Sequence, residues 1–311
     1  MTEVSPRETY GQTLAEMGKD NPDLVVLDAD LSHSTMTHFF AAKFPDRFFN
    51  CGIAEQNMVS IAAGLAASGK VPFASTFAVF APGRCFDQVR MSIAQPGLNV
   101  KLVTTHGGIT VGEDGITHQA IEDLSLICSL PGFTVIVPAD AVETAEAVRW
   151  AAAHRGPVYI RLGRAKLPLV YGPEYRFQPG KAVTMRPGSG VTVIAIGIMV
   201  NTALAAAETL QNEGIECRVL NMPTLKPIDE AAIVQAAHET GAIVTAEEHL
   251  EHGGLGSEVA RVVAQKCPVP MEIVAIKDTY AQSGKPAELL QRYGLTAGDI
   301  VRSVSAVLKR K

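Results

Sequence analysis

Short apolar runs alternate with longer helical patterns in the first part of the chain. The runs are apolar at successive positions, which is typical of strands buried on both faces of a parallel sheet. They lie at residues 24–27, 71–74, 100–104, 134–137 and 158–162. Alanine-rich segments with helical periodicity, such as 58–68 and 141–153, lie between them. The pattern predicts an α/β domain with a helix-covered parallel sheet, and ligand sites at the carboxyl ends of its strands.

A second α/β pattern follows a polar stretch rich in proline and glycine at residues 171–181. Strand-like runs then occupy 191–196, 216–220, 242–246 and 271–275, and residues 202–213 have a helical pattern. Proline and glycine clusters between periodic segments indicate a linker. We therefore expect a first domain at 1–172, a linker at 173–189 and a smaller α/β domain at 190–311.

Composition narrows the class of protein. The length of 311 residues suggests about two domains. The net charge of -5 and the pI near 5.9 argue against nucleic acid or an anionic membrane surface as the main partner. No apolar run approaches the roughly 20 residues that span a bilayer, and the polar N-terminus lacks the apolar centre of a signal peptide. Five scattered cysteines without a CxxC pair fit free thiols, so we expect a cytoplasmic protein.

Glu55 is the first candidate for chemistry. It lies in the segment 51–58, which follows a strand-like run at 47–50 and opens an apolar helix. This places Glu55 near a helix N-terminus at the end of a strand. A glutamate at that position can also serve only to complement the helix dipole, so the residue by itself does not define a site.

Phe77 and Phe80 form the second candidate. Their spacing of three predicts that both rings lie on one face of a helical turn. Core packing explains such a pair as well as a flat apolar platform for an aromatic ligand does.

The segment 105–119 is the most informative part of the sequence. It follows a predicted strand and combines two histidines, an aspartate, a glutamate and four glycines. An α/β protein places polar chemistry at the carboxyl end of such a strand. Histidines can transfer protons near pH 7 or bind phosphate and hydroxyl groups. Two alternatives remain for this segment. One is a metal site, although the segment has no HxxxH pattern and no cysteine partner. The other is a purely structural loop.

Two further segments carry polar residues. Arg164 follows the last predicted strand of the first domain, and Arg161 lies within that strand. Arginine is suited to bidentate contacts with phosphate or carboxylate, although a plain surface role fits equally. The segment 247–257 lacks the third glycine of a dinucleotide fingerprint, because Val259 stands there. We expect a tight strand-to-helix turn in that segment.

Taken together, these motifs resemble the transketolase family over nearly the whole chain. The specific part is GEDGITHQ at 112–119, with His106 eight residues before Asp114, and GIAEQNM and TFAVF stand upstream in the family's order. The resemblance implies a thiamine-diphosphate enzyme with two parts. A parallel-sheet, pyrimidine-binding domain is followed by a smaller transketolase C-terminal domain.

The resemblance implies roles at the cofactor for four residues. Glu55 matches the glutamate that hydrogen-bonds the pyrimidine N1′ and so promotes the tautomer that generates the cofactor's ylid. Phe80 matches the residue that stacks on the pyrimidine, and Phe77 lines the same pocket. Asp30, in an Ala-Asp-Leu segment at 29–31, matches an aspartate near the cofactor and the sugar hydroxyls.

The resemblance also implies a substrate site. His106, Asp114 and His118 match residues that bind the hydroxyls of the donor sugar and assist proton transfer, so the implied catalytic residues are Glu55, His106 and His118. The acceptor's phosphate would be held by a group of four residues, and the 23 positions from Arg7 to Asp30 match the family's spacing. That group is Arg7, Ser34, His106 and Arg164.

Two departures from the family's pattern matter. In the family a tyrosine lines the pyrimidine pocket, and its position falls near Pro82 and Gly83 in this chain, so that contact is lost or replaced. The chain also has no GDG segment followed by an asparagine, which in the family holds the metal of the diphosphate. A diphosphate needs a metal to offset its charge, so no metal ligand is expected in this chain. Mg²⁺ or Ca²⁺ ligands are expected on a separate N-terminal subunit, in an α2β2 heterotetramer.

These features favour the C-terminal subunit of a split transketolase. It would transfer a two-carbon ketol unit from a ketose phosphate to an aldose phosphate, but only with its partner. The alternatives are a beta-type subunit of a 2-oxoacid dehydrogenase, a protein like deoxyxylulose-phosphate synthase, or a non-catalytic paralogue. The sequence leaves open which sugar phosphates, of the pentose phosphate set or others, are used.

Overall fold

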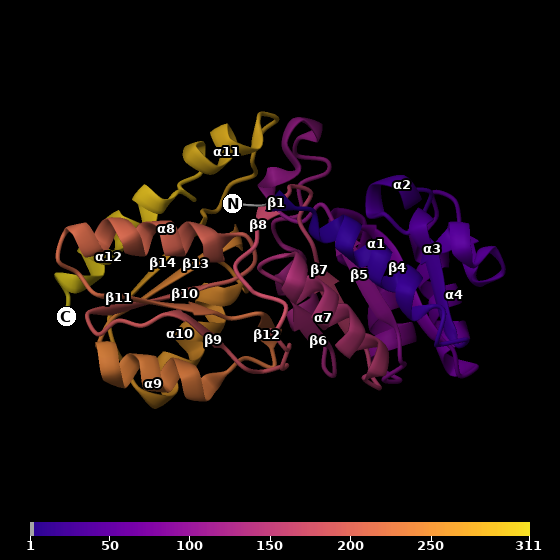
Figure 1. The fold of residues 1–311 in the computed structure, drawn as a ribbon, viewed down its shortest axis with the longest axis horizontal. Coiled ribbons are helices and arrows are strands. Elements are labelled where there is room, and N and C mark those ends of the chain that lie inside the picture. The colour runs from indigo at the N-terminus through magenta and orange to yellow at the C-terminus, as the bar shows by residue number, and fades with distance from the viewer. Residues whose placement is uncertain (1–2) are drawn as a thin grey trace.

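The computed structural model describes residues 3–311, so the first two positions of the expected first domain lie outside the described residues. Two α/β units lie side by side, the first on the right of Figure 1 and the second on the left. Each unit has a central sheet with helices on both faces (Figure 1), which confirms the α/β class predicted from the apolar pattern.

The first unit is built on a seven-stranded sheet with the order β12-β6-β7-β5-β4-β2-β3. Its six strands from the first half of the chain run parallel, as the continuous apolar runs of five of them predict. They are β2 (Leu24–Asp28), β3 (Phe48–Asn50), β4 (Val71–Phe77), β5 (Lys101–Thr105), β6 (Thr134–Ile136) and β7 (Val158–Arg161). Because parallel strands end at one edge, the loops after β2, β4 and β5 meet there.

Helices cover both faces of this sheet because successive strand residues point to opposite sides. Val26 packs in one core with helices α1, α3 and α7, and Leu27 packs in the other with α4, α5 and α6. The helices of the unit are α1 (Pro6–Met17), α2 (Ser32–Thr35), α3 (His38–Lys43), α4 (Glu55–Ala67), α5 (Arg84–Gln88), α6 (Asp123–Cys128) and α7 (Ala141–Ala153). The short strands β1 (Glu3–Val4) and β8 (Leu167–Pro168) pair next to the start of α1.

The second unit has a five-stranded sheet with the order β14-β13-β10-β11-β9. Four of its strands are parallel, and β9 is antiparallel to β11. The strands are β9 (Val183–Arg186), β10 (Val191–Ala195), β11 (Cys217–Asn221), β13 (Ile243–Leu250) and β14 (Met271–Ile276). Helices α8 (Met199–Asn212) and α12 (Ala297–Leu308) pack on one face, whereas α9 (Glu230–Thr240) and α10 (Leu255–Lys266) pack on the other. Helix α11 (Pro286–Arg292) lies towards the first unit (Figure 1).

Two short strands differ from the sequence-based division. Strand β9 lies inside the segment 173–189 that we expected to be a linker, because the β-favouring residues at 183–185 are flanked by proline and glycine that hide the pattern. Strand β12 (Thr224–Lys226) belongs to the second half of the chain but pairs antiparallel with β6. The first sheet is therefore completed by the second unit.

The two units also share a hydrophobic core. Ile194 and Leu220 from the second sheet belong to the same buried cluster as Leu27 and Met58 of the first.

No helix in the part of the chain that the structure describes is long and apolar enough to cross a membrane. All five cysteines are free.

Candidate functional site

The carboxyl edge of the first sheet gathers most of the residues singled out in the sequence. Phe77 is the last residue of β4, His106 directly follows β5, and Asp30 lies two residues after β2. These three strands are neighbours in the order β5-β4-β2. The sheet topology therefore places three segments that are far apart in sequence at one edge.

Phe77, Phe80 and the two histidines form one aromatic cluster. The ring of His106 stacks on Phe77 with centroids 3.8 Å apart, and the Phe77 and Phe80 rings are nearly parallel at 5.8 Å. His118 meets the Phe80 ring edge-on at 5.5 Å. Phe77 ends a strand and Phe80 lies in the π-helical turn Val79–Gly83. The shared helical turn that we expected is therefore wrong, but the rings still form a common apolar wall.

His106 is held in a constrained position. Its backbone adopts a φ of 61°, and its Nδ1 lies 2.8 Å from the hydroxyl of Thr105. Burial, together with the positive charges of Arg7 and Arg164, lowers the pKa of His106 to about 3. The imidazole is therefore neutral at pH 7, and its Nε2 is left to exchange a hydrogen bond with a ligand.

Two arginines approach the histidine from different elements. Arg7, in the first turn of α1, donates a hydrogen bond from Nη1 to the backbone oxygen of Ser34 at 2.5 Å. Its buried Nε has no protein partner. Burial and the charge of Arg164 lower the pKa of Arg7. Two like charges that face one another, with a spare buried donor, favour an anionic ligand between them.

Arg164 also organises the loop that follows β5. Its Nη1 donates to the backbone oxygen of Val111 at 2.5 Å, and the carboxylates of Glu113 and Asp114 lie 3.7 and 3.8 Å away. His118, near the end of the loop, is half-buried, with Nδ1 2.9 Å from the Thr117 hydroxyl. The loop thus curves around the Arg164 guanidinium.

Asp30 lies on the same edge but stands apart from the aromatic cluster. Its backbone has a φ of 64°, and it exchanges hydrogen bonds with Asn50 at 3.0 and 3.1 Å. The loop around it is held by Asp28, which is fully buried. Asp28 accepts hydrogen bonds from the Leu31 amide at 2.6 Å and the Thr35 hydroxyl at 2.6 Å. Burial raises the pKa of Asp28, and these bonds offset part of that shift.

Glu55 begins helix α4, where it is 3% exposed. Arg84 places Nη1 2.8 Å from Glu55 Oε1 and its Cζ 4.3 Å from the centre of the Phe80 ring. Arg84 and Asp28 were not among the residues predicted from the sequence. The spacing of Arg84 four residues after Phe80 was the one available signal, since one helical turn places such residues on the same face.

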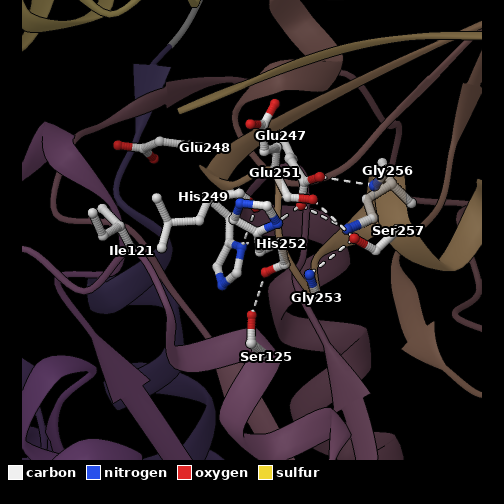
Figure 2. Close-up of polar contacts among 12 residues, drawn as sticks. Ile121, Ser125, Glu247, Glu248, His249, Glu251, His252, Gly253, Gly256 and Ser257 are labelled. Atoms are coloured by element: carbon white, nitrogen blue, oxygen red, sulfur yellow. Dashed lines mark hydrogen bonds and ion pairs between the residues drawn. The ribbon is translucent and has the colours of Figure 1, made fainter. Parts of the chain in front are cut away.

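The segment 247–257 forms the expected strand-to-helix turn, as Figure 2 shows. Glu247 accepts hydrogen bonds from the amides of Leu255 at 2.6 Å and Gly256 at 2.8 Å, where α10 begins. The Ser257 hydroxyl donates to the Glu251 backbone oxygen at 2.8 Å and accepts from the Gly253 amide. Burial raises the pKa of Glu247 to about 7. Among residues 3–311, no group of three or more histidine, cysteine, aspartate or glutamate side chains is placed to hold a metal ion.

The fold and the site define a class of protein with two α/β domains. The first has a parallel sheet that carries aromatic and ionisable side chains at its carboxyl edge. Residues 2–170 match the family model described as transketolase, pyrimidine binding domain, and residues 180–300 match that of the transketolase C-terminal domain. The chain therefore belongs to the transketolase family. This confirms the resemblance and the order of the two domain types.

Relatives fall into two length classes. The chain is 43% identical to the 6-deoxy-6-sulfo-D-fructose transketolase subunit SqwH of Clostridium sp. (strain MSTE9), over 98% of this chain and 95% of that protein. It is 40% identical to transketolase from Homo sapiens, over 99% of this chain but 49% of that protein. The chain thus spans about half of the human enzyme and nearly all of the subunit.

Solved structures show the same division. A split-gene transketolase, solved as an inactive beta4 tetramer, is 52% identical and superposes with a TM-score of 0.93 over 99% of both chains. Transketolase from Campylobacter jejuni is 25% identical, with a TM-score of 0.81 over 98% of this chain and 47% of that one. The chain is thus similar over its full length to one component of a split-gene transketolase.

Proposed function

We propose that this chain is the C-terminal subunit of a split transketolase. With a separate N-terminal subunit, it would transfer a two-carbon ketol unit from a ketose phosphate to an aldose phosphate. One observation carries the proposal. A buried glutamate beside an aromatic wall, two histidines and two arginines converge on one sheet edge of a transketolase-family fold.

The cofactor side of the site fits a thiamine pyrimidine ring. Glu55 is a buried carboxyl group that would share a proton with a ring nitrogen, and Phe80 offers a flat ring near it. When bound, thiamine diphosphate supplies a nucleophilic carbon that adds to carbonyl groups. Glu55 would hold the proton at the pyrimidine nitrogen and Phe80 would orient the ring. We assign the Mg²⁺ or Ca²⁺ ligands to the partner subunit.

The substrate side fits a phosphorylated sugar. Arg7 and Arg164 would bind the phosphate as paired cations, with Ser34 fixing the position of Arg7. His106, neutral at pH 7, would exchange hydrogen bonds with sugar hydroxyls. His118 and Asp114 would bind further hydroxyls and move a proton, while Asp30 would approach the sugar from the next loop.

Exposed apolar side chains near Glu55 support a contact with another subunit. Ile53 is 80% exposed, and Ile61 and Phe49 are also exposed around the same helix. Exposed apolar groups become buried when another subunit covers them, which is favourable. We propose that the partner subunits cover this surface in an α2β2 heterotetramer and so close the cofactor site. A cytoplasmic location remains our prediction from the free thiols.

Reconstitution with an N-terminal transketolase subunit from the same genome tests the proposal. Ketol transfer and tight binding of thiamine diphosphate are expected from the two chains together and from neither alone. Glu55→Ala should remove transfer, whereas Asp23→Asn, at an exposed ion pair with Lys70, should leave it unchanged. Tight cofactor and Mg²⁺ binding by this chain alone, or full transfer by Glu55→Ala, would contradict the proposal.

A further inference from the structure

Glu248 reaches from the second unit to the substrate side of the first. It lies on β13, and its Oε1 accepts a hydrogen bond from the backbone amide of Thr110 at 2.6 Å. Both residues are 3% exposed. Thr110 belongs to the loop 106–119, which carries His106, Asp114 and His118. One carboxylate of the C-terminal domain therefore supports the backbone of that loop directly.

The loop is shaped to receive this carboxylate. Gly108 has a φ of 85°, and a β-carbon there would lie 2.2 to 2.4 Å from the carboxylate atoms of Glu248. A residue with a side chain cannot stand at this point without moving either the loop or the glutamate. The absence of a side chain at Gly108 therefore leaves the space that the Glu248 carboxylate occupies.

Arg161 ties the far end of the loop to the same residue. Its Nη2 donates to the backbone oxygens of Glu248 at 3.0 Å and Ala120 at 3.1 Å. Its Nε binds the carboxylate of Asp123 at 3.0 Å. Burial raises the pKa of Glu248, and the positive charge of the buried Arg161 offsets part of that shift. The side-chain amide of Gln119 adds a bond to the Gln282 backbone oxygen at 3.1 Å.

We propose that Glu248 is a positioning residue through which the C-terminal domain fixes the loop 106–119 for substrate binding. The neighbouring residues of β13 divide the work. Glu247 faces its own helix α10, whereas Glu248 points towards the first unit, as Figure 2 shows. The inference rests on the proposed function only where it names the ligand of this loop as a substrate. The contact between Glu248 and the loop lies within this chain.

Removal of the carboxylate leaves a buried amide without an acceptor, which is costly. Glu248→Ala should therefore loosen the loop, while Glu248→Gln keeps an oxygen in the place of Oε1 and should preserve it. Gly108→Ala disturbs the same contact from the loop side, because its β-carbon would collide with the Glu248 carboxylate. The three variants separate the role of the hydrogen bond from that of bulk.

Hydrogen–deuterium exchange on the whole chain measures the effect without the partner. We expect Glu248→Ala and Gly108→Ala to speed amide exchange in peptides covering 106–119, by on the order of tenfold or more. Glu248→Gln should exchange like the wild type, and peptides of α8 should be unchanged in all variants. Unaltered exchange in the loop, or an equal rise in every peptide, would overturn the proposal, since the latter would make Glu248 only a stability residue.

The reconstituted complex supplies the second measurement. There Glu248→Ala should lower kcat/KM for the ketose phosphate by a larger factor than it raises the Kd of thiamine diphosphate, because neither Glu55 nor Phe80 belongs to the loop. An equal loss of cofactor affinity would overturn the positioning role. A complex with no transfer at all would instead refute the proposed function, and the exchange result would still decide the role of Glu248.

Discussion

Arg84 pairs with Glu55 at 2.8 Å while its guanidinium covers the Phe80 ring at 4.3 Å. These are the two groups that we assign to the pyrimidine ring, so the ring and the arginine compete for them. Arg84 is 44% exposed and can swing into solvent. We therefore infer that a bound pyrimidine ring would have to displace Arg84 from Glu55 and Phe80.

Replacement of Arg84 by alanine should strengthen cofactor binding. A partly exposed ion pair is worth up to about 1 kcal/mol, so the Kd of thiamine diphosphate should fall by up to about fivefold in the reconstituted complex. Calorimetric titration measures the change. Arg90→Ala, at an exposed arginine in the next helical segment, is the control. Weaker binding in Arg84→Ala would show instead that the arginine supports the ring.

The depressed pKa of His106 predicts a pH dependence of stability. Its pKa is about 3 in the folded chain and about 6.5 when unfolded, so the unfolded state binds the proton more readily. Stability is thus retained above about pH 6.5 and lost as the pH falls towards 3. In His106→Asn, the fall of Tm between pH 6.5 and 4 should be shallower than in the wild type.

Calorimetry across this pH range makes the comparison. His252→Asn, at an exposed histidine, serves as the matched control and should follow the wild-type curve. His249, whose pKa burial lowers to about 4, acts in the same direction in every variant. Identical acid slopes for His106→Asn and the wild type would refute a buried neutral imidazole.

Arg164 should matter for phosphorylated acceptors in particular. A charge-assisted hydrogen bond is worth about 1.5–3 kcal/mol, so Arg164→Gln should raise KM for an aldose phosphate by roughly tenfold to a hundredfold. Glycolaldehyde, which lacks the phosphate, should be used about as well as by the wild type. Steady-state kinetics with both acceptors separate the two effects. Arg164→Lys keeps the charge but loses the planar fork, so it should recover only part of the loss. An equal penalty for both acceptors would argue against a phosphate contact.

Asp28 should be a strong determinant of stability. Its buried carboxylate accepts three hydrogen bonds, from Leu31, Thr35 and Thr37. Asparagine would place its amide NH2 group, a donor, against some of these donors. Asp28→Asn should therefore lower the free energy of unfolding by about 2–4 kcal/mol. Urea unfolding measures the loss, with Asp20→Asn at an exposed position as the control. A change within about 0.5 kcal/mol would refute the role of Asp28.

The strands of the first sheet could be predicted because each is a continuous apolar run, and burial on both faces writes that pattern into the sequence. Strand β12 could not, since three residues carry no periodicity and their pairing with β6 depends on the tertiary fold. His106 was visible because it follows a predicted strand, and Phe77 because of its spacing from Phe80. The stacking of their rings was not, because it depends on the pairing of β4 with β5, which sets Phe77 opposite Thr105.

Contacts between residues that are distant in sequence could not be predicted from the sequence. Glu248 and Thr110 are 138 positions apart, and nothing local to either residue indicates the other. The segment 247–257 was correctly expected to form a turn, yet Glu248 within it also contacts the first domain. Arg84 and Glu55 are separated by 29 positions. Such pairs are set by how elements pack, and spacing rules describe only neighbours within one element.

Strand β12 gives the molecule an interlocked architecture. A polypeptide that stopped near residue 172 would leave the edge of β6 unpaired, and an open strand edge promotes aggregation. It would also expose the side of the core that Ile194 and Leu220 cover. The two halves of this chain therefore form a single folding unit, and recombination between relatives should succeed only when both halves are inherited together.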